Sequence, residues 1–344
     1  MMHLKASTPS SRNVSQCGAI VDKANEANLL ADIVRRKLQK GENVFGVALH
    51  VKRGRFLGLS LVLVAGIALT GSIPGAGAQK RSTLGGSHTI HSRHGLSPEA
   101  REMVELASTA VCRERVEDPV GSVPIDEMQR RPSLSVRSPQ AVEGAERAQR
   151  LLPVAKTLVI ISLRRLAADY RFRGYDNKIR RAIAQVEAVR NIRADMDSRD
   201  NASVFMKSPH TIIFGTIFLA GLPSDEGIIS VLAHELVHIA DGGEDNLRLL
   251  FRAVGNRASY LTGFRINGQR AEELTCDLVG TVAARAYVTS FPSYEPLPRR
   301  ISRSLGHNCV EQDEGDDDHL SPRKTIHTLL ALNPTLTREL VYGR

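Results

Sequence analysis

One short stretch of the chain combines residue types that could carry out chemistry. It reads His234-Glu-Leu-Val-His238, with two histidines four positions apart and a glutamate directly after the first. Positions i and i+4 lie on one face of an α-helix, so both imidazoles can reach the same metal ion, for which zinc is the expected choice. A carboxylate at Glu235 could then take a proton from a zinc-bound water. The pattern therefore indicates zinc-dependent hydrolysis.

This motif needs a helix, and its surroundings predict one over 224–241. Ser224 is a suitable N-cap, and Gly242-Gly243 can end the helix. Aliphatic residues at helical spacing surround the motif: Ile228, Ile229, Val231, Leu232, Leu236, Val237 and Ile239. Imidazoles without a ligand would be costly among such side chains, so a metal site is favoured over an unliganded pair of histidines.

Two histidines need a third protein ligand, and three glutamates are candidates. Glu244 follows His238 by six residues, as in one known arrangement. That arrangement needs a glycine where Asp241 stands, and its ligand is His or Asp rather than Glu. Glu244 is therefore the weakest candidate, and Glu272 and Glu273 remain.

Glu272 and Glu273 lie near the start of a helix expected over 269–289. Asp277 follows Glu273 by four residues, so the two carboxylates share a face. Asp277 can then accept a hydrogen bond from a ligating imidazole, which fixes its tautomer. Glu272 has no such partner four residues later, and Glu273 is preferred. The alternative for this stretch is an exposed acidic turn.

The two motifs together resemble those of a known family. His-Glu-x-x-His on one helix, followed by Glu-x-x-x-Asp on a later helix, is similar to the gluzincin peptidases of the HtpX-like and CAAX prenyl endopeptidase-like (Ste-type) group. A second signature agrees with it. An Asn201-Ala202 strand, a further apolar stretch over 211–222 and the zinc helix follow in the family's order. The similarity covers roughly 175–290.

This resemblance implies a zinc-dependent endopeptidase with a zincin-like fold. His234, His238 and Glu273 would be the zinc ligands, Glu235 the general base, and Asp277 the residue that orients a ligand. The resemblance also implies that the strand near 202–206 pairs with an extended peptide substrate.

Two positions depart from the family's pattern. Cys276 stands where alanine is frequent; it could be a buried small residue, half of a disulfide or an additional zinc ligand. The family's C-terminal His-Pro-Pro segment with a following arginine is matched only loosely by His319-Leu-Ser-Pro-Arg323. By resemblance His319 would help to stabilise the oxyanion; as a residue alone it fits a surface loop equally well.

The N-terminal part carries an uncharged segment of 18 residues, 56–73, preceded by three basic residues. Small residues up to Ala78 follow it. This order is typical of a signal peptide over 51–78 cleaved after Ala78, and the alternative is an uncleaved membrane anchor. Either places the rest of the chain in the periplasm or outside the cell. Residues 1–50 are a polar extension or an upstream translation artefact.

The exported part divides by composition near residue 141. Residues 79–140 are rich in Ser, Arg, Pro and Gly and indicate a linker or pro-like segment, with one helix at 97–113. Residues 141–344 are expected to form the peptidase domain. Its predicted elements are helices over 144–170, 179–189 and 245–262, a strand over 192–196 and a hairpin of strands 203–206 and 211–214. Helices around a small sheet beside the zinc helix give an α+β fold.

The composition narrows the classes of function. The net charge is +9, of which +7 lies in residues 1–150 (21 basic against 14 acidic). This excess comes without interleaved aromatic residues, which argues against a nucleic-acid partner. Four cysteines are too few for a disulfide-stapled scaffold, although Cys309 is expected to be paired.

Two other functions remain open from the residues alone. One is a non-enzymatic adaptor on an inactive peptidase fold, against which the intact Glu235 argues. The other is a zinc-stabilised structural protein, in which Cys276 closes the metal site as a fourth ligand. The leading expectation is an endopeptidase with one zinc ion and a protein or peptide substrate.

Overall fold

The computed structural model describes residues 95–117, 131–170, 174–205, 210–221, 224–243, 245–291, 293, 295–305, 309 and 315–343. This part of the chain is mostly helical, at 71% of its residues, and contains a three-stranded sheet, so it is compatible with the α+β class. The uncharged segment 56–73, interpreted as part of a signal peptide or membrane anchor, lies outside the described residues, as does the polar extension 1–50. Among those described, no helix is both long and apolar enough to cross a membrane.

With one exception, the helices and strands up to residue 290 follow the sequence expectations closely. The described helices are α2 (Pro98–Glu117), α4 (Pro139–Asp169), α5 (Asp176–Ala188), α6 (Thr216–Gly221), α7 (Asp225–Asp241), α8 (Arg248–Thr262), α9 (Gln269–Ser290), α10 (Leu297–Leu305), α11 (Pro322–Leu332) and α12 (Pro334–Tyr342). The strands are β1 (Asn191–Asp195), β2 (Ala202–Val204) and β3 (Thr211–Gly215). Helices α6, α10, α11 and α12 have no counterpart among the expected elements.

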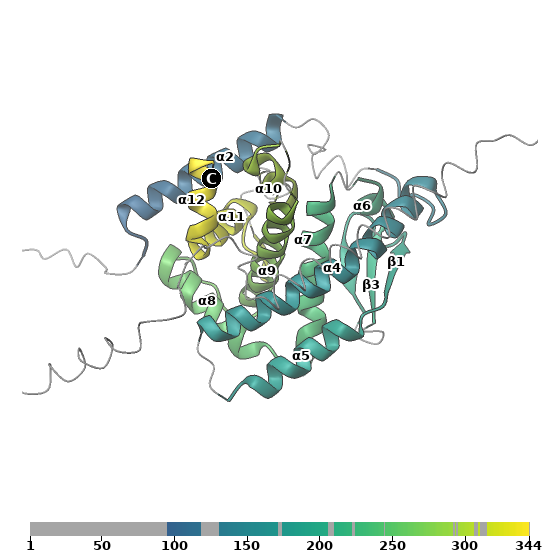
Figure 1. Cartoon of the computed structure of the whole chain (residues 1–344), viewed down its shortest axis with the longest axis horizontal. Coiled ribbons are helices and arrows are strands. Elements are labelled where there is room, and N and C mark those ends of the chain that lie inside the picture. The colour runs from purple at the N-terminus through teal and green to yellow at the C-terminus, as the bar shows by residue number, and fades with distance from the viewer. Residues whose placement is uncertain are drawn as a thin grey trace, which may run out of the picture. The chain divides into compact units, whose positions relative to one another are not determined.

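Helix α7 forms the centre of the core, where α4, α5, α9 and α10 pack against it (Figure 1). Its apolar residues are fully buried around most of the helix. The expected caps are present: the Ser224 hydroxyl accepts a hydrogen bond from the Gly227 N–H, and Gly242 adopts a left-handed conformation at φ 64°. Burial of this helix holds the two motif histidines at fixed positions in the fold.

The sheet has the strand order β1-β3-β2, so β2 lies at an edge. β2 and β3 pair in antiparallel fashion, as the predicted hairpin requires, although residues 206–209 of its turn lie outside the described part. β1 pairs in parallel with β3, from Asn191 opposite Thr211 to Asp195 opposite Gly215. Helices α4 and α6 lie beside this sheet and connect it to the helical core.

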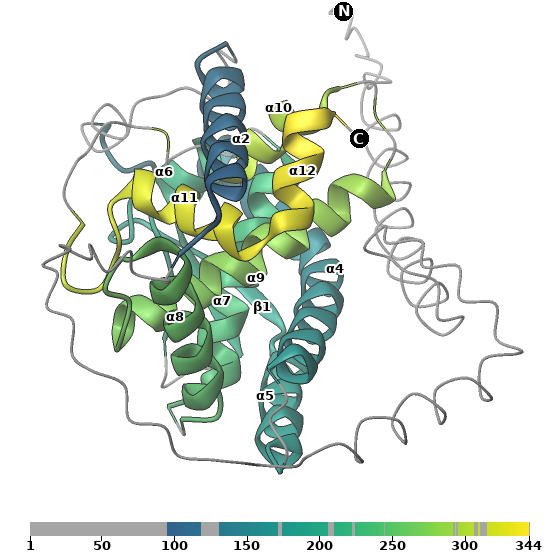
Figure 2. The same cartoon turned by 90° about the vertical axis from the view of Figure 1, so that its left-hand side faces the viewer.

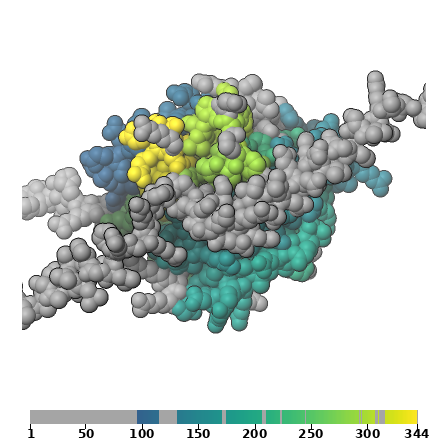
Figure 3. All heavy atoms as spheres, viewed as in Figure 1, coloured from purple at the N-terminus to yellow at the C-terminus, as the bar shows by residue number. Residues whose placement is uncertain are grey.

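Helix α2 belongs to the packed core, although the composition predicts a linker segment over 79–140. It buries Val104, Ala107 and Val111 and packs against α10, α11 and α12 (Figure 2). The space-filling view of Figure 3 shows α2 and α12 as neighbours on one side of the molecule. A disulfide joins Cys112 of this helix to Cys309. The packed domain therefore begins well before residue 141.

Candidate metal centre

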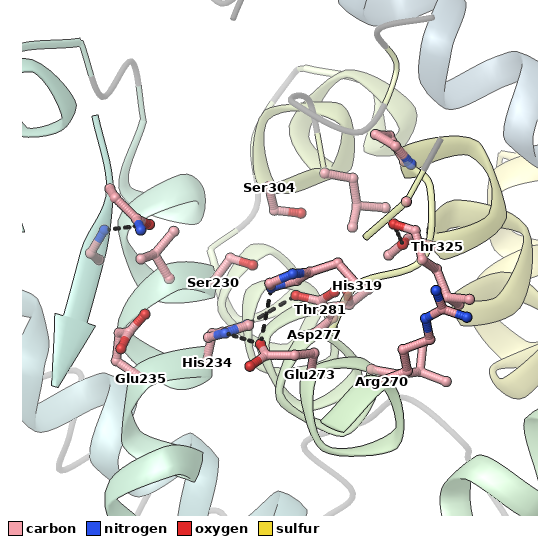
Figure 4. A pocket seen from close by; sticks show the side chains of 18 of the residues that line it. Ser230, His234, Glu235, Arg270, Glu273, Asp277, Thr281, Ser304, His319 and Thr325 are labelled. Atoms are coloured by element: carbon pink, nitrogen blue, oxygen red, sulfur yellow. Dashed lines mark hydrogen bonds and ion pairs between the residues drawn. The ribbon is translucent and has the colours of Figure 1, made fainter. Parts of the chain in front are cut away.

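Helices α7 and α9 bring three side chains with metal-binding groups to one point. His234 Nε2 and His238 Nε2 are 3.2 Å apart. Glu273 Oε2 lies 3.3 Å from His234 Nε2 and 3.5 Å from His238 Nε2. Figure 4 shows the Glu273 carboxylate facing the His234 imidazole across the gap between the helices. The glutamate preferred from the sequence thus lies with both histidines of the motif.

A small residue allows the two helices to come this close. A Cβ added at Gly280 of α9 would lie 2.7 Å from the backbone oxygen of Ser230 on α7, well inside van der Waals contact. Any side chain at this position would push α9 away from α7. Close packing here keeps the carboxylates of α9 within hydrogen-bond reach of the imidazoles of α7.

Each motif histidine makes a second contact through its other ring nitrogen. Asp277 Oδ1 lies 2.9 Å from His234 Nδ1, and Glu272 Oε1 lies 3.0 Å from His238 Nδ1. An ionised carboxylate only accepts hydrogen bonds, so each Nδ1 donates in its contact. In the neutral ring this leaves the Nε2 lone pair free for a metal ion, and in the imidazolium Nε2 carries a proton that Glu273 can accept. Such carboxylate partners fix the ring orientation of metal-ligating histidines and make them better ligands.

The three converging atoms have the geometry of a tetrahedral zinc site. Zinc–ligand bonds of about 2.0–2.1 Å place neighbouring ligand atoms roughly 3.3 Å apart. The observed separations of 3.2, 3.3 and 3.5 Å match this value. Three electron pairs that point at one spot repel each other unless a cation or protons lie between them. The donor set of two imidazoles and one carboxylate therefore fits zinc.

Cys276 forms a second group with the same histidines. Ligand atoms of His234, His238 and Cys276 all lie within 4.8 Å of one another, so this His-His-Cys group could also hold a metal ion. The cysteine is free and fully buried. Its sulfur lies 3.8 Å from Nδ1 of His238, the nitrogen that faces Glu272. The two histidines therefore belong to two possible ligand sets, one completed by Glu273 and one by Cys276.

Glu235 lines the cavity next to the two motif histidines and is only 6% exposed. Burial raises the pKa of its carboxyl group, while the neighbouring imidazoles of His234 and His238 oppose that shift. The Glu273 carboxyl is affected in the other direction. Burial would raise its pKa, but its close contacts with the imidazoles of His234, His238 and His319 hold it well below its ordinary value. The two glutamates thus differ in proton affinity, which suits a base beside a ligand.

His319 reaches the site from the segment before α11. Its Nε2 lies 3.6 Å from Glu273 Oε2, and its Nδ1 lies 3.1 Å from Asp316 Oδ1. The contact with the Glu273 carboxylate raises the pKa of His319 to about 9. Arg270 of α9 donates from Nε to the backbone oxygen of Asp316 at 3.1 Å. His319 is thus held over the cavity from both sides, although its side chain is 56% exposed.

These residues line a cavity of about 440 Å³. Ala202 of the edge strand β2 and the preceding Asn201 contribute to one wall, and the segment from Gly315 to Pro322 contributes to the opposite wall. Helices α7 and α9 form its floor, with the side chains of Figure 4 pointing into the space between them.

Two residues of the site, Glu272 and Asp316, make contacts that the sequence does not predict. The spacing of Glu272 makes it only an alternative ligand without a partner, whereas it contacts His238. Asp316 belongs to an acidic run that fits a solvated loop, whereas it holds His319. Spacing within one helix gives no signal for either contact. The third glutamate candidate, Glu244, lies outside the described residues.

We found no matching family model, curated protein or solved structure for this chain.

Proposed function

We propose that this chain is a zinc-dependent endopeptidase with a zincin-like fold. The observation that supports this most strongly is the convergence of His234 Nε2, His238 Nε2 and Glu273 Oε2 beside the buried carboxyl group of Glu235. Three protein ligands with an open fourth position are the arrangement of a catalytic zinc, whereas structural sites use four. The 440 Å³ cavity leaves room for a substrate at that position.

Each residue of the site would have a separate role in the hydrolysis. Zinc held by His234, His238 and Glu273 would polarise the scissile carbonyl and lower the pKa of the attacking water from 15.7 towards about 7. Glu235 takes one proton from this water and delivers it to the leaving amine nitrogen. The water oxygen bonds to the carbonyl carbon, the C–N bond breaks, and the products are a carboxylic acid, which then ionises, and an amine. Asp277 holds the Nδ1 proton of His234, which keeps the Nε2 lone pair available.

The substrate binds as an extended peptide along β2. An edge strand offers unpaired backbone groups, and a peptide added there gains main-chain hydrogen bonds. His319 donates a hydrogen bond to the carbonyl oxygen as it becomes negative, because its ring overhangs the ligand cluster from the opposite wall. The proposal thus assigns substrate binding to one wall of the cavity and oxyanion stabilisation to the other.

The proposed location is outside the cytoplasm. A disulfide between Cys112 and Cys309 supports it, since such bonds persist mainly in oxidising compartments. The segment 56–73 would direct export and would anchor the chain to the membrane where it is not cleaved. N-terminal sequencing of the exported protein tests the cleavage after Ala78.

The decisive experiment measures cleavage of casein or a quenched fluorescent peptide by the purified chain. We expect activity that a chelator abolishes and added zinc restores. Glu235→Gln should keep its zinc and lose at least about a hundredfold in kcat, because the general base is gone. Glu143→Gln makes the same change at an exposed position of α4 and should be fully active. Undiminished activity in Glu235→Gln would exclude this residue as the base.

A second candidate function uses the His-His-Cys group. If Cys276 were a ligand, the metal would have only protein ligands and would stabilise the fold without catalysis. Cys276→Ser separates the two functions when the metal content is measured by elemental analysis. The structural site predicts a large loss of zinc in this variant, whereas the endopeptidase predicts that it keeps one zinc ion per chain.

A further inference from the structure

The cavity extends past His234 into a recess that the proposed reaction does not use. Four hydroxyl residues line it: Ser230, Thr281, Ser304 and Thr325, which we call the hydroxyl recess. Ser230 lies one turn before His234 on α7, and Thr281 lies one turn after Asp277 on α9. The recess is therefore at the end of the ligand cluster away from His238. In Figure 4 these four labelled residues surround the space beside the His319 ring.

The hydroxyl group of Thr281 is buried without a hydrogen-bond partner among the described residues. The residue as a whole is 1% exposed. Threonines inside helices commonly donate to the carbonyl four residues earlier. Thr275 on the same helix does so, to Ala271 O at 2.6 Å. A buried hydroxyl without a partner costs free energy, and a ligand that pairs with it in the recess would remove that cost.

Two other hydroxyl groups of the recess already donate hydrogen bonds to backbone carbonyl groups. Ser304 Oγ donates to Ile301 O at 2.7 Å, and Thr325 Oγ1 donates to Leu320 O at 3.5 Å. Each therefore offers only lone pairs to anything that enters the recess. The Asp277 carboxylate borders the same space and adds negative charge. Ser304, Thr325 and Asp277 thus offer acceptors to the recess, and the unpaired Thr281 hydroxyl can either accept or donate.

We propose that the hydroxyl recess is a specificity subsite for a substrate side chain that ends in N–H donors, such as the amide of glutamine. This inference rests on the proposed endopeptidase function. An amide can donate to the lone pairs of Ser304 and Thr325 and can also pair with the hydroxyl of Thr281. An apolar side chain of the same length leaves that hydroxyl unpaired, and an acidic one is repelled by Asp277.

Peptides that differ at one residue test this subsite. Glutamine, methionine and glutamate have similar lengths, and each is placed in turn at the four central positions of an otherwise constant quenched peptide. We expect one position at which kcat/KM for glutamine exceeds that for methionine by about tenfold, with glutamate the poorest. Thr281→Val should reduce that ratio to below about threefold. Thr328→Val changes a buried, internally bonded threonine outside the cavity and should retain the full ratio.

Binding to the Glu235→Gln variant separates this inference from the proposed function. The same peptides are titrated by fluorescence anisotropy, which needs no cleavage. A glutamine preference in binding that is lost in the double variant with Thr281→Val supports the subsite even if the chain cleaves nothing. Equal handling of glutamine and methionine at all four positions, in cleavage or in binding, overturns it while leaving the endopeptidase intact.

Discussion

The two carboxylates behind the imidazoles give a quantitative prediction about metal affinity. Asp277→Asn and Glu272→Gln remove the negative charge that fixes the Nδ1 proton of His234 and His238 and keep the size of the side chain. Loss of such a partner typically weakens metal binding by 10–100-fold. The Asp277 side chain is 29% exposed and that of Glu272 is 32% exposed, so water screens both charges. We therefore expect the lower end, about tenfold in each variant, or about 1.4 kcal/mol.

Competition with a chromophoric chelator of known zinc affinity measures these changes. Asp316→Asn is the matched control, because Asp316 bonds to His319 and contacts neither of the motif histidines in the described structure. Glu273→Gln should lose more zinc affinity than either partner variant, since it removes a ligand. Zinc affinity within threefold of the unmodified chain in both partner variants would refute the assignment of Nε2 as the ligating atom.

Three further outcomes follow from the same structure. Cys276→Ser should keep one zinc per chain, and a cobalt-substituted sample of the unmodified chain should lack the intense near-ultraviolet band of a sulfur ligand. Glu226→Gln should lower the free energy of unfolding by about 3–5 kcal/mol in urea titrations, because it leaves Arg300 buried without its counter-charge at 2.7 Å. Replacement of Cys112 and Cys309 by serine should cost about 2–5 kcal/mol, and a reducing agent should then no longer affect the melting temperature.

Local signals in the sequence predict the part of the site that lies on single helices. Apolar spacing and the caps at Ser224 and Gly242 give the bounds of α7 nearly to the residue. The spacing of Glu273 and Asp277 selects one glutamate from three. Both inferences depend on residues within one or two turns of each other, which is the range over which spacing in a sequence encodes a shared helix face.

Long-range packing decides the rest. The contact of Glu272 with His238 depends on how α9 lies against α7, and no spacing within α9 encodes it. The parallel pairing of β1 with β3 likewise joins segments about twenty residues apart. Helices α11 and α12 are short and begin with Pro322 and Pro334. In the sequence each proline suggests the end of a helix, although it occupies a first helical position here.

The bond between Cys112 and Cys309 has a consequence for maturation. The two cysteines are 197 positions apart and enclose both motif helices. A single backbone cut at any exposed peptide bond between them would yield two polypeptides that stay covalently attached. Such a nicked protein would migrate as one band on a non-reducing gel and as two bands after thiol treatment. A precursor could therefore be processed ahead of α4 without releasing α2 from the rest of the packed domain.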